Sequence, residues 1–222
     1  YNADFSASRT IDQVTGSPIP WNTARDAYNF GPLNYWQRPD ERWSAAAFMH
    51  YDVADSATVY TEFMFHDDST KSQIAPSGLF GVTTAVACDG SNPLITAQWQ
   101  SFLCGTATTG TRDATILRRN VEGGGRQDDI RHTSYRGVVG VKGDVWDNWN
   151  YDVNASYSTV VFQQTYLNDF SISRSQKALD VVRGPDGSPV CRSVIDGTDP
   201  NCVPYDVWTL GRVTPEALAY VQ

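Results

Sequence analysis

The stretch RWSAAAFMHYDV, residues 42–53, alternates between two kinds of side chain. Its odd-numbered positions are apolar or aromatic, namely Trp43, Ala45, Ala47, Met49, Tyr51 and Val53. Its even-numbered positions include the polar residues Arg42, Ser44, His50 and Asp52. A period of two that is kept over this length is typical of an extended strand with one apolar and one polar face, and it does not fit a helix.

Three further stretches repeat this alternation. After a short break at residues 54–56, the apolar residues Val59, Phe63 and Phe65 alternate with Tyr60, Glu62 and His66, and Thr61 is the one polar residue on the apolar side. The second pair sets Tyr135, Val139, Val141 and Val145 against Ser134, Arg136, Lys142 and Asp144, then Trp149, Tyr151, Val153, Ala155, Tyr157 and Val161 against Asn150, Asp152, Asn154, Ser156 and Ser158. Together the four stretches predict two antiparallel hairpins and an all-β fold.

The length of these stretches distinguishes them from ordinary strands. A strand tilted across a bilayer needs roughly 9 to 11 residues, whereas most strands run about 5 or 6. Aromatic residues also lie beside both predicted turns, as in the girdles of outer-membrane barrels, with Tyr51 at the first turn and Trp146, Trp149 and Tyr151 around the second. The sequence therefore predicts antiparallel strands of a transmembrane β-barrel. A soluble sheet with one face on a core gives the same alternation, so a carbohydrate-binding β-sandwich is the alternative.

Composition argues against several other classes. The 222 residues carry a net charge of −8, and no apolar run has the length of a transmembrane helix. Acidity provides no basic patch for nucleic acid, and Gly123, Gly124 and Gly125 lack the Lys and Ser or Thr of a phosphate-binding loop. We therefore expect no nucleic acid, nucleotide or other cofactor. The chain begins at Tyr1 without Met, so we expect a processed or excerpted sequence.

We also expect no enzymatic activity. A glycoside hydrolase needs two carboxylates across one cleft, and the best candidates, Asp52 and Glu62, lie on neighbouring predicted strands. The polar face carries charges of both signs, and the chain lacks a G-x-S-x-G nucleophile motif.

The four cysteines form two local pairs, Cys88 with Cys104 and Cys191 with Cys202, in polar stretches outside the predicted strands. This arrangement predicts disulfides that close loops in an oxidising compartment. A zinc site is disfavoured because the pairs lack the close spacing and the nearby His of structural zinc sites. Four cysteines allow three pairings, so the connectivity is a hypothesis.

Turn and cap signals complete the predicted organisation. Ser173 and Gln176 fit a capping box that would begin a short helix, and Thr214 with Pro215 predicts a second helix at the end of the chain. Asp186-Gly187 and Asp196-Gly197 are turn signals. We expect a loop at 1–40, a hairpin at 41–67, a disulfide-bridged loop at 68–112, a hairpin at 113–170, and a loop with short helices at 171–222.

Several segments resemble TonB-dependent receptors of Gram-negative bacteria. They are YNFGPLNY at 28–35 with RPDERW at 38–43, HYDV at 50–53 leading to VYTE at 59–62, YRGVVG at 135–140, and the loop from Cys191 to Cys202 that leads into TPEAL at 214–218. The order and spacing of these segments carry the resemblance, which covers most of the chain.

The resemblance implies a piece of the 22-stranded barrel of an active transporter in the cell outer membrane, closed by a plug in the complete protein. The chain has no plug domain, energy-coupling box or terminal strand ending in an aromatic residue, so we expect an internal portion of the barrel. The implied cargo is a scarce solute: a siderophore, a cobalamin or an oligosaccharide. The implied partners are the rest of the barrel and plug, the TonB energy-transducing complex, outer-membrane lipid and a possible surface-exposed partner.

In such a barrel the even-numbered charged residues would face the lumen: Arg42, His50, Asp52, Glu62, Arg136, Lys142, Asp144 and Asp152. With residues 146–148 as the turn, Lys142 lies opposite Asp152, a favourable cross-strand charge pair that we interpret as structural. His50 and His66 are interpreted as polar lining rather than metal ligands, and no metal site is expected.

Ligand contact in this family is expected at the plug apex and the extracellular loops. The candidates are exposed loop aromatics: Tyr28, Tyr35, Trp36, Trp99 and Phe102. Trp99 and Phe102 lie between paired cysteines, so they alternatively fill a small loop core. The oxygens of Asp196 to Asn201 favour a plain turn over a calcium site, because their spacing departs from the helix-loop-helix calcium pattern.

Overall fold

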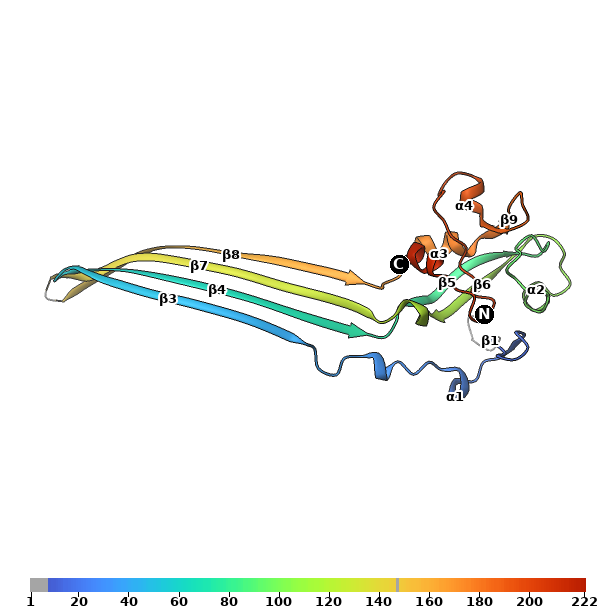
Figure 1. Ribbon diagram of the computed structural model, residues 1–222, viewed down its shortest axis with the longest axis horizontal. Coiled ribbons are helices and arrows are strands. Elements are labelled where there is room, and N and C mark those ends of the chain that lie inside the picture. Colours follow the sequence, from blue (N-terminus) through green and yellow to red (C-terminus); the bar gives the residue numbers. More distant parts are fainter. Residues whose placement is uncertain (1–7, 147) are drawn as a thin grey trace. The chain divides into compact units, whose positions relative to one another are not determined.

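The four alternating stretches form one sheet. The computed structural model describes residues 8–146 and 148–222. The sheet has the strand order β3 (Asp40–Ala54), β4 (Ala57–Ile74), β7 (Arg126–Trp146) and β8 (Trp149–Leu167) (Figure 1). The chain divides into two units. Of the described residues, 35–73, 127–146 and 148–166 form the sheet unit, and 8–34, 74–126 and 167–222 form the core unit.

The register between β3 and β4 fixes which side chains share a face of the sheet. Ala45 lies opposite Phe65, and Tyr51 lies opposite Val59. Odd-numbered residues are therefore paired with odd-numbered residues, and both sets lie on the same face. We call this the odd face and the opposite one the even face. The register confirms the predicted alternation for this pair of strands.

All four strands are longer than the roughly 9 to 11 residues expected of a bilayer span. They have 15, 18, 21 and 19 residues. β4 continues past residue 67 to Ile74, and β7 begins at Arg126 instead of 113. Residues 68–74 of β4 and 126–134 of β7 are mainly polar on both faces, so they lack the alternation that marks the rest of each strand. The hydrogen-bonded ladder continues without it, because backbone pairing does not require an apolar face.

The core unit contains a hairpin of β5 (Gly78–Ala87) and β6 (Thr111–Arg119) that the sequence pattern did not predict. The two strands pair in antiparallel register. Helix α3 (Ile172–Leu179) packs against β5 and against α5 (Pro215–Val221), and α2 (Ala97–Cys104) packs against β6. The smaller elements are β1 (Arg9–Ile11), β2 (Pro18–Pro20), α1 (Thr23–Asp26), η1 (Gly31–Leu33), η2 (Val121–Gly123), β9 (Val181–Arg183), β10 (Pro189–Cys191) and α4 (Arg192–Ile195). The described chain is thus mostly β, with its helices in the core unit.

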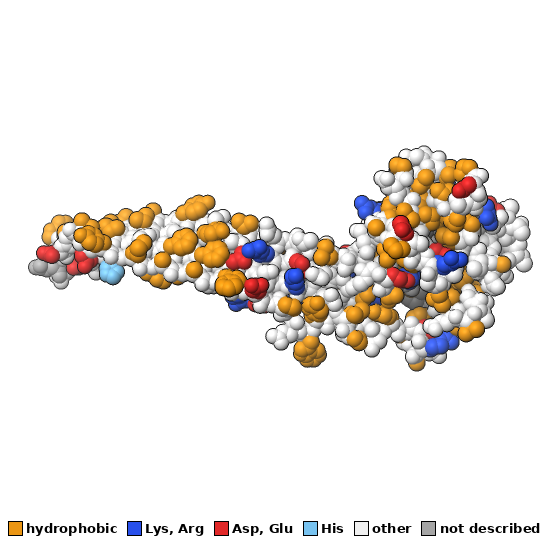
Figure 2. All heavy atoms as spheres, in the orientation of Figure 1, with side chains coloured by type: hydrophobic (Ala, Val, Ile, Leu, Met, Phe, Trp, Pro, Cys, Tyr) orange, Lys and Arg blue, Asp and Glu red, His pale blue; other side chains and the backbone are white. Residues whose placement is uncertain are grey.

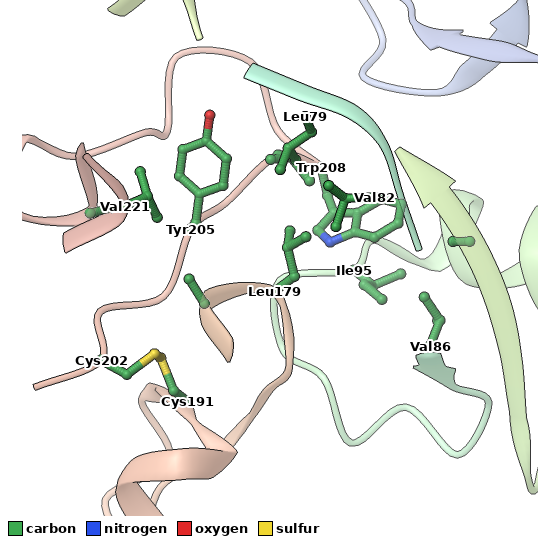
Figure 3. Packing of buried hydrophobic residues seen from close by; sticks show 14 of the residues in the cluster. Leu79, Val82, Val86, Ile95, Leu179, Cys191, Cys202, Tyr205, Trp208 and Val221 are labelled. Carbon is green, nitrogen blue, oxygen red and sulfur yellow. A yellow bond between two sulfur atoms is a disulfide. The ribbon is translucent and has the colours of Figure 1, made fainter. Parts of the chain in front are cut away.

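An apolar cluster holds these elements together (Figure 3). Leu79 of β5, Leu179 of α3 and Val221 of α5 are buried in it. Tyr205 and Trp208, from the loop before α5, lie in the same cluster. Burying one large apolar side chain contributes roughly 1.5–3 kcal/mol. The loops predicted at 68–112 and 171–222 therefore build a hydrophobic core of their own.

Both predicted disulfides form. Cys88 is bonded to Cys104 and Cys191 to Cys202, with Cα–Cα distances of 5.6 and 6.0 Å. All four sulfur-bearing side chains are buried. The bridges are therefore part of the packing of the core unit as well as closures of its loops.

Both predicted short helices form, and only the predicted cap of the first one is wrong. The Thr214 hydroxyl accepts a hydrogen bond from the Ala217 amide and caps α5, as predicted. α3 is capped by Ser171, two residues before the predicted Ser173, because the Ser171 hydroxyl is the one that accepts from the Arg174 amide.

Among the described residues, no helix is both long enough and apolar enough to cross a membrane.

Candidate functional site

The even face of the sheet gathers the charged residues expected to line a lumen. His50 lies opposite Tyr60, and Asp52 lies opposite Thr58, whose hydroxyl donates to the Asp52 carboxylate at 2.7 Å. Arg42 and Glu62 have the same parity on the same two strands, as do Lys142 and Asp144 on β7. On the far strands, an Arg136 nitrogen lies 4.0 Å from the Met64 sulfur, and Asp152 is bonded to Tyr60. Alternation thus places all eight candidates on one face.

Tyr60 spans three strands of the even face. Its hydroxyl donates to the Asp152 carboxylate on β8 at 2.7 Å, and its ring crosses β7 at Gly140. A Cβ at residue 140 would lie 2.5 Å from a ring carbon of Tyr60, so only glycine leaves room for this crossing. The Lys142 ammonium lies 5.8 Å from the centre of the same ring.

The predicted pairing of Lys142 with Asp152 is only partly realised. Tyr151 lies against Gly143, one position along both strands, which is consistent with the predicted register. Nevertheless, the ion pairs of residues 8–146 and 148–222 do not include Lys142 with Asp152. Tyr60, and not Lys142, is the hydrogen-bond partner of Asp152. The Lys142 ammonium instead makes a cation–π contact with the face of the Tyr60 ring.

A second tyrosine makes the reverse crossing on the odd face. The Tyr151 hydroxyl of β8 donates to the Ser56 carbonyl in the β3–β4 turn at 3.1 Å, and it passes Gly143 of β7. Sequence reasoning missed both tyrosine contacts. The available signal was the pair of glycines inside a predicted strand, since such glycines mark close approach by another group.

Two histidines flank one carboxylate at the other end of the even face. His66 Nε2 and His132 Nδ1 lie 3.5 and 3.4 Å from different oxygens of Asp68, and Ser44 Oγ lies 2.8 Å from His66 Nδ1. His66 therefore has polar partners on the face expected of it, while His132 was not singled out. No group of three His, Cys, Asp or Glu residues in the described ranges is arranged to hold a metal ion.

The odd face is apolar and remains exposed over most of its length. Trp43, Met49, Tyr51, Val153 and Tyr157 are each more than 60% exposed, at 64, 65, 74, 65 and 75%. Figure 2 shows hydrophobic side chains spread along the sheet. So much exposed apolar surface on one sheet indicates a face that is covered by something else in its working environment.

A polar network ends the apolar part of the odd face. Asp67 follows Phe65 on this face, and it accepts hydrogen bonds from the Arg131 guanidinium at 3.1 Å and from the Thr133 hydroxyl. Asp67 is only 7% exposed. Next to this network the rings of Phe65 and Tyr135 are 5.4 Å apart, so the change from apolar to polar occurs at the same level on β4 and β7.

Both edges of the sheet are open in the described residues. β3 and β8 end the strand order, so each pairs with one neighbour only. Unpaired N–H and C=O groups along edges of 15 and 19 residues are a template for further strands.

The loop aromatics divide into exposed and buried residues. Tyr28, Tyr35 and Trp36 are exposed, Trp36 completely. Trp99 is buried, with ring-centre distances of 6.1 Å to Phe102 and 5.6 Å to Trp208. Trp99 is therefore not an exposed loop aromatic. Trp99 lies on α2, which the Cys88–Cys104 disulfide ties to the core unit. The position of Trp99 agrees with the alternative prediction that it fills a small loop core.

The segment from Asp196 to Asn201 is folded as a turn. The Asp196 carboxylate accepts from the amide and hydroxyl of Thr198, at 2.9 and 2.6 Å. The Asp199 carboxylate accepts from Lys177 at 2.9 Å and from Tyr220 at 2.8 Å, and these two hydrogen bonds hold the pKa of Asp199 below its ordinary value. Both carboxylates thus have protein partners.

No protein-family model matches this sequence, and no curated protein matches it.

Proposed function

We propose that the chain is a wall segment, with its loops, of an outer-membrane TonB-dependent receptor that imports a scarce solute by energy-coupled transport. The observation that carries this proposal is the two-faced sheet. Its odd face is apolar and exposed, with aromatic residues beside both turns at one end and the Asp67 network at the other. Its even face carries the charged residues, together with a few exposed apolar ones such as Phe48 and Val160. Outer-membrane barrels have this combination of an apolar outer band and a polar interior.

The dimensions of the apolar band support the proposal. Trp43 and Val53 mark its two ends on β3, ten residues apart. At about 3.3 Å per residue this is roughly 33 Å along the strand. A strand tilted by about 40° then rises roughly 25 Å, the height of the apolar band of outer-membrane barrels.

The open edges of β3 and β8 fit a segment of a larger barrel. Hydrocarbon cannot satisfy backbone N–H and C=O groups, so a sheet in a membrane must close on itself. In the proposed protein the missing strands are the rest of the barrel, and outer-membrane lipid covers the odd face.

The even face would line the lumen and face the plug. The resemblance implies that loops and plug capture the solute and that the TonB energy-transducing complex then displaces the plug. Charges of both signs on the even face suit polar contacts that form and break without covalent chemistry. The solutes compatible with the resemblance are a siderophore, a cobalamin or an oligosaccharide.

The alternative is a soluble carbohydrate-binding β-sandwich. A sandwich would cover the odd face with a second sheet about 10 Å away. In the part of the chain that the structure describes, Met49, Val153 and Tyr157 of this face are largely exposed, which favours the barrel.

Membrane fractionation tests the proposal. The native protein should be recovered from the outer membrane only with detergent, as part of a larger, heat-modifiable polypeptide. A freely soluble monomer of about the size of this chain would refute it.

A matched pair of variants tests the orientation of the faces. Val153→Arg on the odd face should cost about 2–4 kcal/mol near the bilayer midplane and reduce the heat-modifiable form. Asn154→Arg on the even face should leave that form nearly unchanged. Equal losses in both variants would contradict the assignment of the faces.

A further inference from the structure

A recess in the core unit has no role in the wall just described. It has a volume of about 370 Å³, near the lower end of the roughly 300–1,000 Å³ range of small-molecule sites. Its polar lining includes Thr84, Asn92, Gln176, Asp180 and Arg192. We propose that this recess binds a neutral, hydroxyl-rich ligand, such as a unit of an oligosaccharide.

Both disulfide-bridged loops contribute to the recess. Asn92 lies between Cys88 and Cys104, and Arg192 directly follows Cys191. The Asn92 side chain is 8% exposed, and its carbonyl oxygen accepts from the Leu94 amide at 3.0 Å. The two bridges therefore hold polar groups from distant parts of the chain in fixed positions, which lowers the entropic cost of binding.

Asp180 and Arg192 form the charged part of the lining. Arg192 Nε donates to the two Asp180 oxygens at 3.2 and 3.0 Å, and the Arg192 amide donates to the Asp180 carbonyl at 2.8 Å. The two terminal nitrogens of the guanidinium make no hydrogen bond to any residue in the described ranges. These two nitrogens can therefore donate hydrogen bonds to a ligand, and the bonds from Nε to Asp180 fix the orientation of the guanidinium plane.

The uncharged groups add both donors and acceptors. The Gln176 side chain is exposed on α3 and has no hydrogen bond to another described residue, so it offers an amide donor and a carbonyl acceptor. Thr84 adds a hydroxyl, and Ala87 and Val181 add small apolar surfaces.

This set of groups selects a class of ligand. A sugar hydroxyl both donates and accepts hydrogen bonds, so it can use the guanidinium and the carboxylate together. Asp180 and Arg192 carry no net charge together, so the recess offers no uncompensated charge that would draw in an ionic ligand. Among the three solutes compatible with the resemblance, the recess therefore favours an oligosaccharide.

The role of the recess as a point of solute capture rests on the proposed transport function, but ligand binding itself does not. A suitable assay probes a glycan array of neutral, anionic and cationic oligosaccharides with the protein purified from membranes in detergent. Affinity for a retained neutral glycan is then measured by calorimetry.

Gln176→Ala and Arg192→Gln are the test variants. Each should weaken binding of the neutral glycan about tenfold or more, because each removes hydrogen bonds to the ligand. Arg183→Gln, at an exposed residue that does not line the recess, is the control and should bind like the wild type. Alanine is a good helix former, so Gln176→Ala tests the site even if Arg192→Gln perturbs the fold.

Three results would overturn the proposal: no neutral glycan is retained, anionic or cationic glycans are preferred, or both test variants bind like the control. Such a failure is distinct from that of the barrel, since recovery from the outer membrane does not depend on the recess. Glycan binding by a freely soluble protein would instead keep the recess and refute the barrel.

Discussion

Tyr205 makes the stability of the core unit depend on pH in the alkaline range. Its side chain is 1% exposed, and burial raises its pKa from 10.0 to about 12. Its hydroxyl donates to the Asn120 side chain at 2.9 Å and accepts from Arg118 at 2.8 Å. Because the raised pKa belongs to the folded state, the neutral phenol stabilises the fold below about pH 10, and this stabilisation is lost as the pH rises from 10 to 12.

The size of the loss follows from the two pKa values. At pH 11 the phenol of the unfolded chain is mostly ionised, while that of the folded chain is mostly neutral. The free energy of unfolding then falls by about 1.4 kcal/mol relative to pH 8, a tenfold change in the unfolding equilibrium. A Tyr205→Phe variant lacks this term. At pH 8 it should be less stable than the wild type by about 1–3 kcal/mol, because Arg118 and Asn120 lose a buried partner.

The assay is urea unfolding in detergent at pH 8, 9, 10 and 11, followed by near-ultraviolet circular dichroism. The difference between wild type and Tyr205→Phe should shrink by about 1.4 kcal/mol between pH 8 and pH 11. Tyr220, whose pKa is also raised to about 12, is present in both proteins and cancels in the comparison. A difference that stays constant over this range would refute the proposed role of Tyr205.

Three further tests use substitutions in other parts of the structure. Gly140→Ala should cost about 1–3 kcal/mol by forcing the crossing tyrosine ring aside, whereas Gly137→Ala, where a Cβ meets no atom within 4 Å, should cost much less; equal melting temperatures would contradict the crossing. Replacing Cys191 and Cys202 together by Ser should lower the stability of the core unit by about 2–4 kcal/mol in urea, and an unchanged midpoint would show that the bridge is dispensable. Leu79→Ala should cost about 2–5 kcal/mol, and a loss below 1 kcal/mol would contradict its place in the core.

The long strands could be predicted from sequence because most apolar residues in 42–53, 59–66, 135–145 and 149–161 have odd numbers. β5 could not, because a bulge between Phe80 and Val82 changes the parity of its inward residues. Leu79 and Val82 are both buried, although one is odd-numbered and the other even-numbered. Gly81, with a φ of 85°, supplies the extra residue of the bulge. A strand of this kind has no uniform alternation to detect.

The sequence could predict only which face of the sheet a candidate site residue lies on, because odd or even numbering alone determines the face. The even-face charges follow from alternation within single strands. The contact between Tyr60 and Asp152 depends on the register of three strands, which no single stretch of sequence specifies. The burial of Trp99 depends on the fold of the core unit around the disulfide of α2. The cap of α3 was misplaced because Ser171 and Ser173 are both competent caps, and only the backbone geometry distinguishes them.

The two crossing tyrosines have a consequence for how β7 aligns with its neighbours. Tyr60 crosses β7 at Gly140 on one face, and Tyr151 crosses it at Gly143 on the other. If β7 slipped by two residues in either direction, Val138 or Lys142 would lie beneath Tyr60, and side chains would likewise replace Gly143 beneath Tyr151. A slip by one residue would exchange the two faces. Gly140 and Gly143 therefore fix the register of β7 against its neighbouring strands.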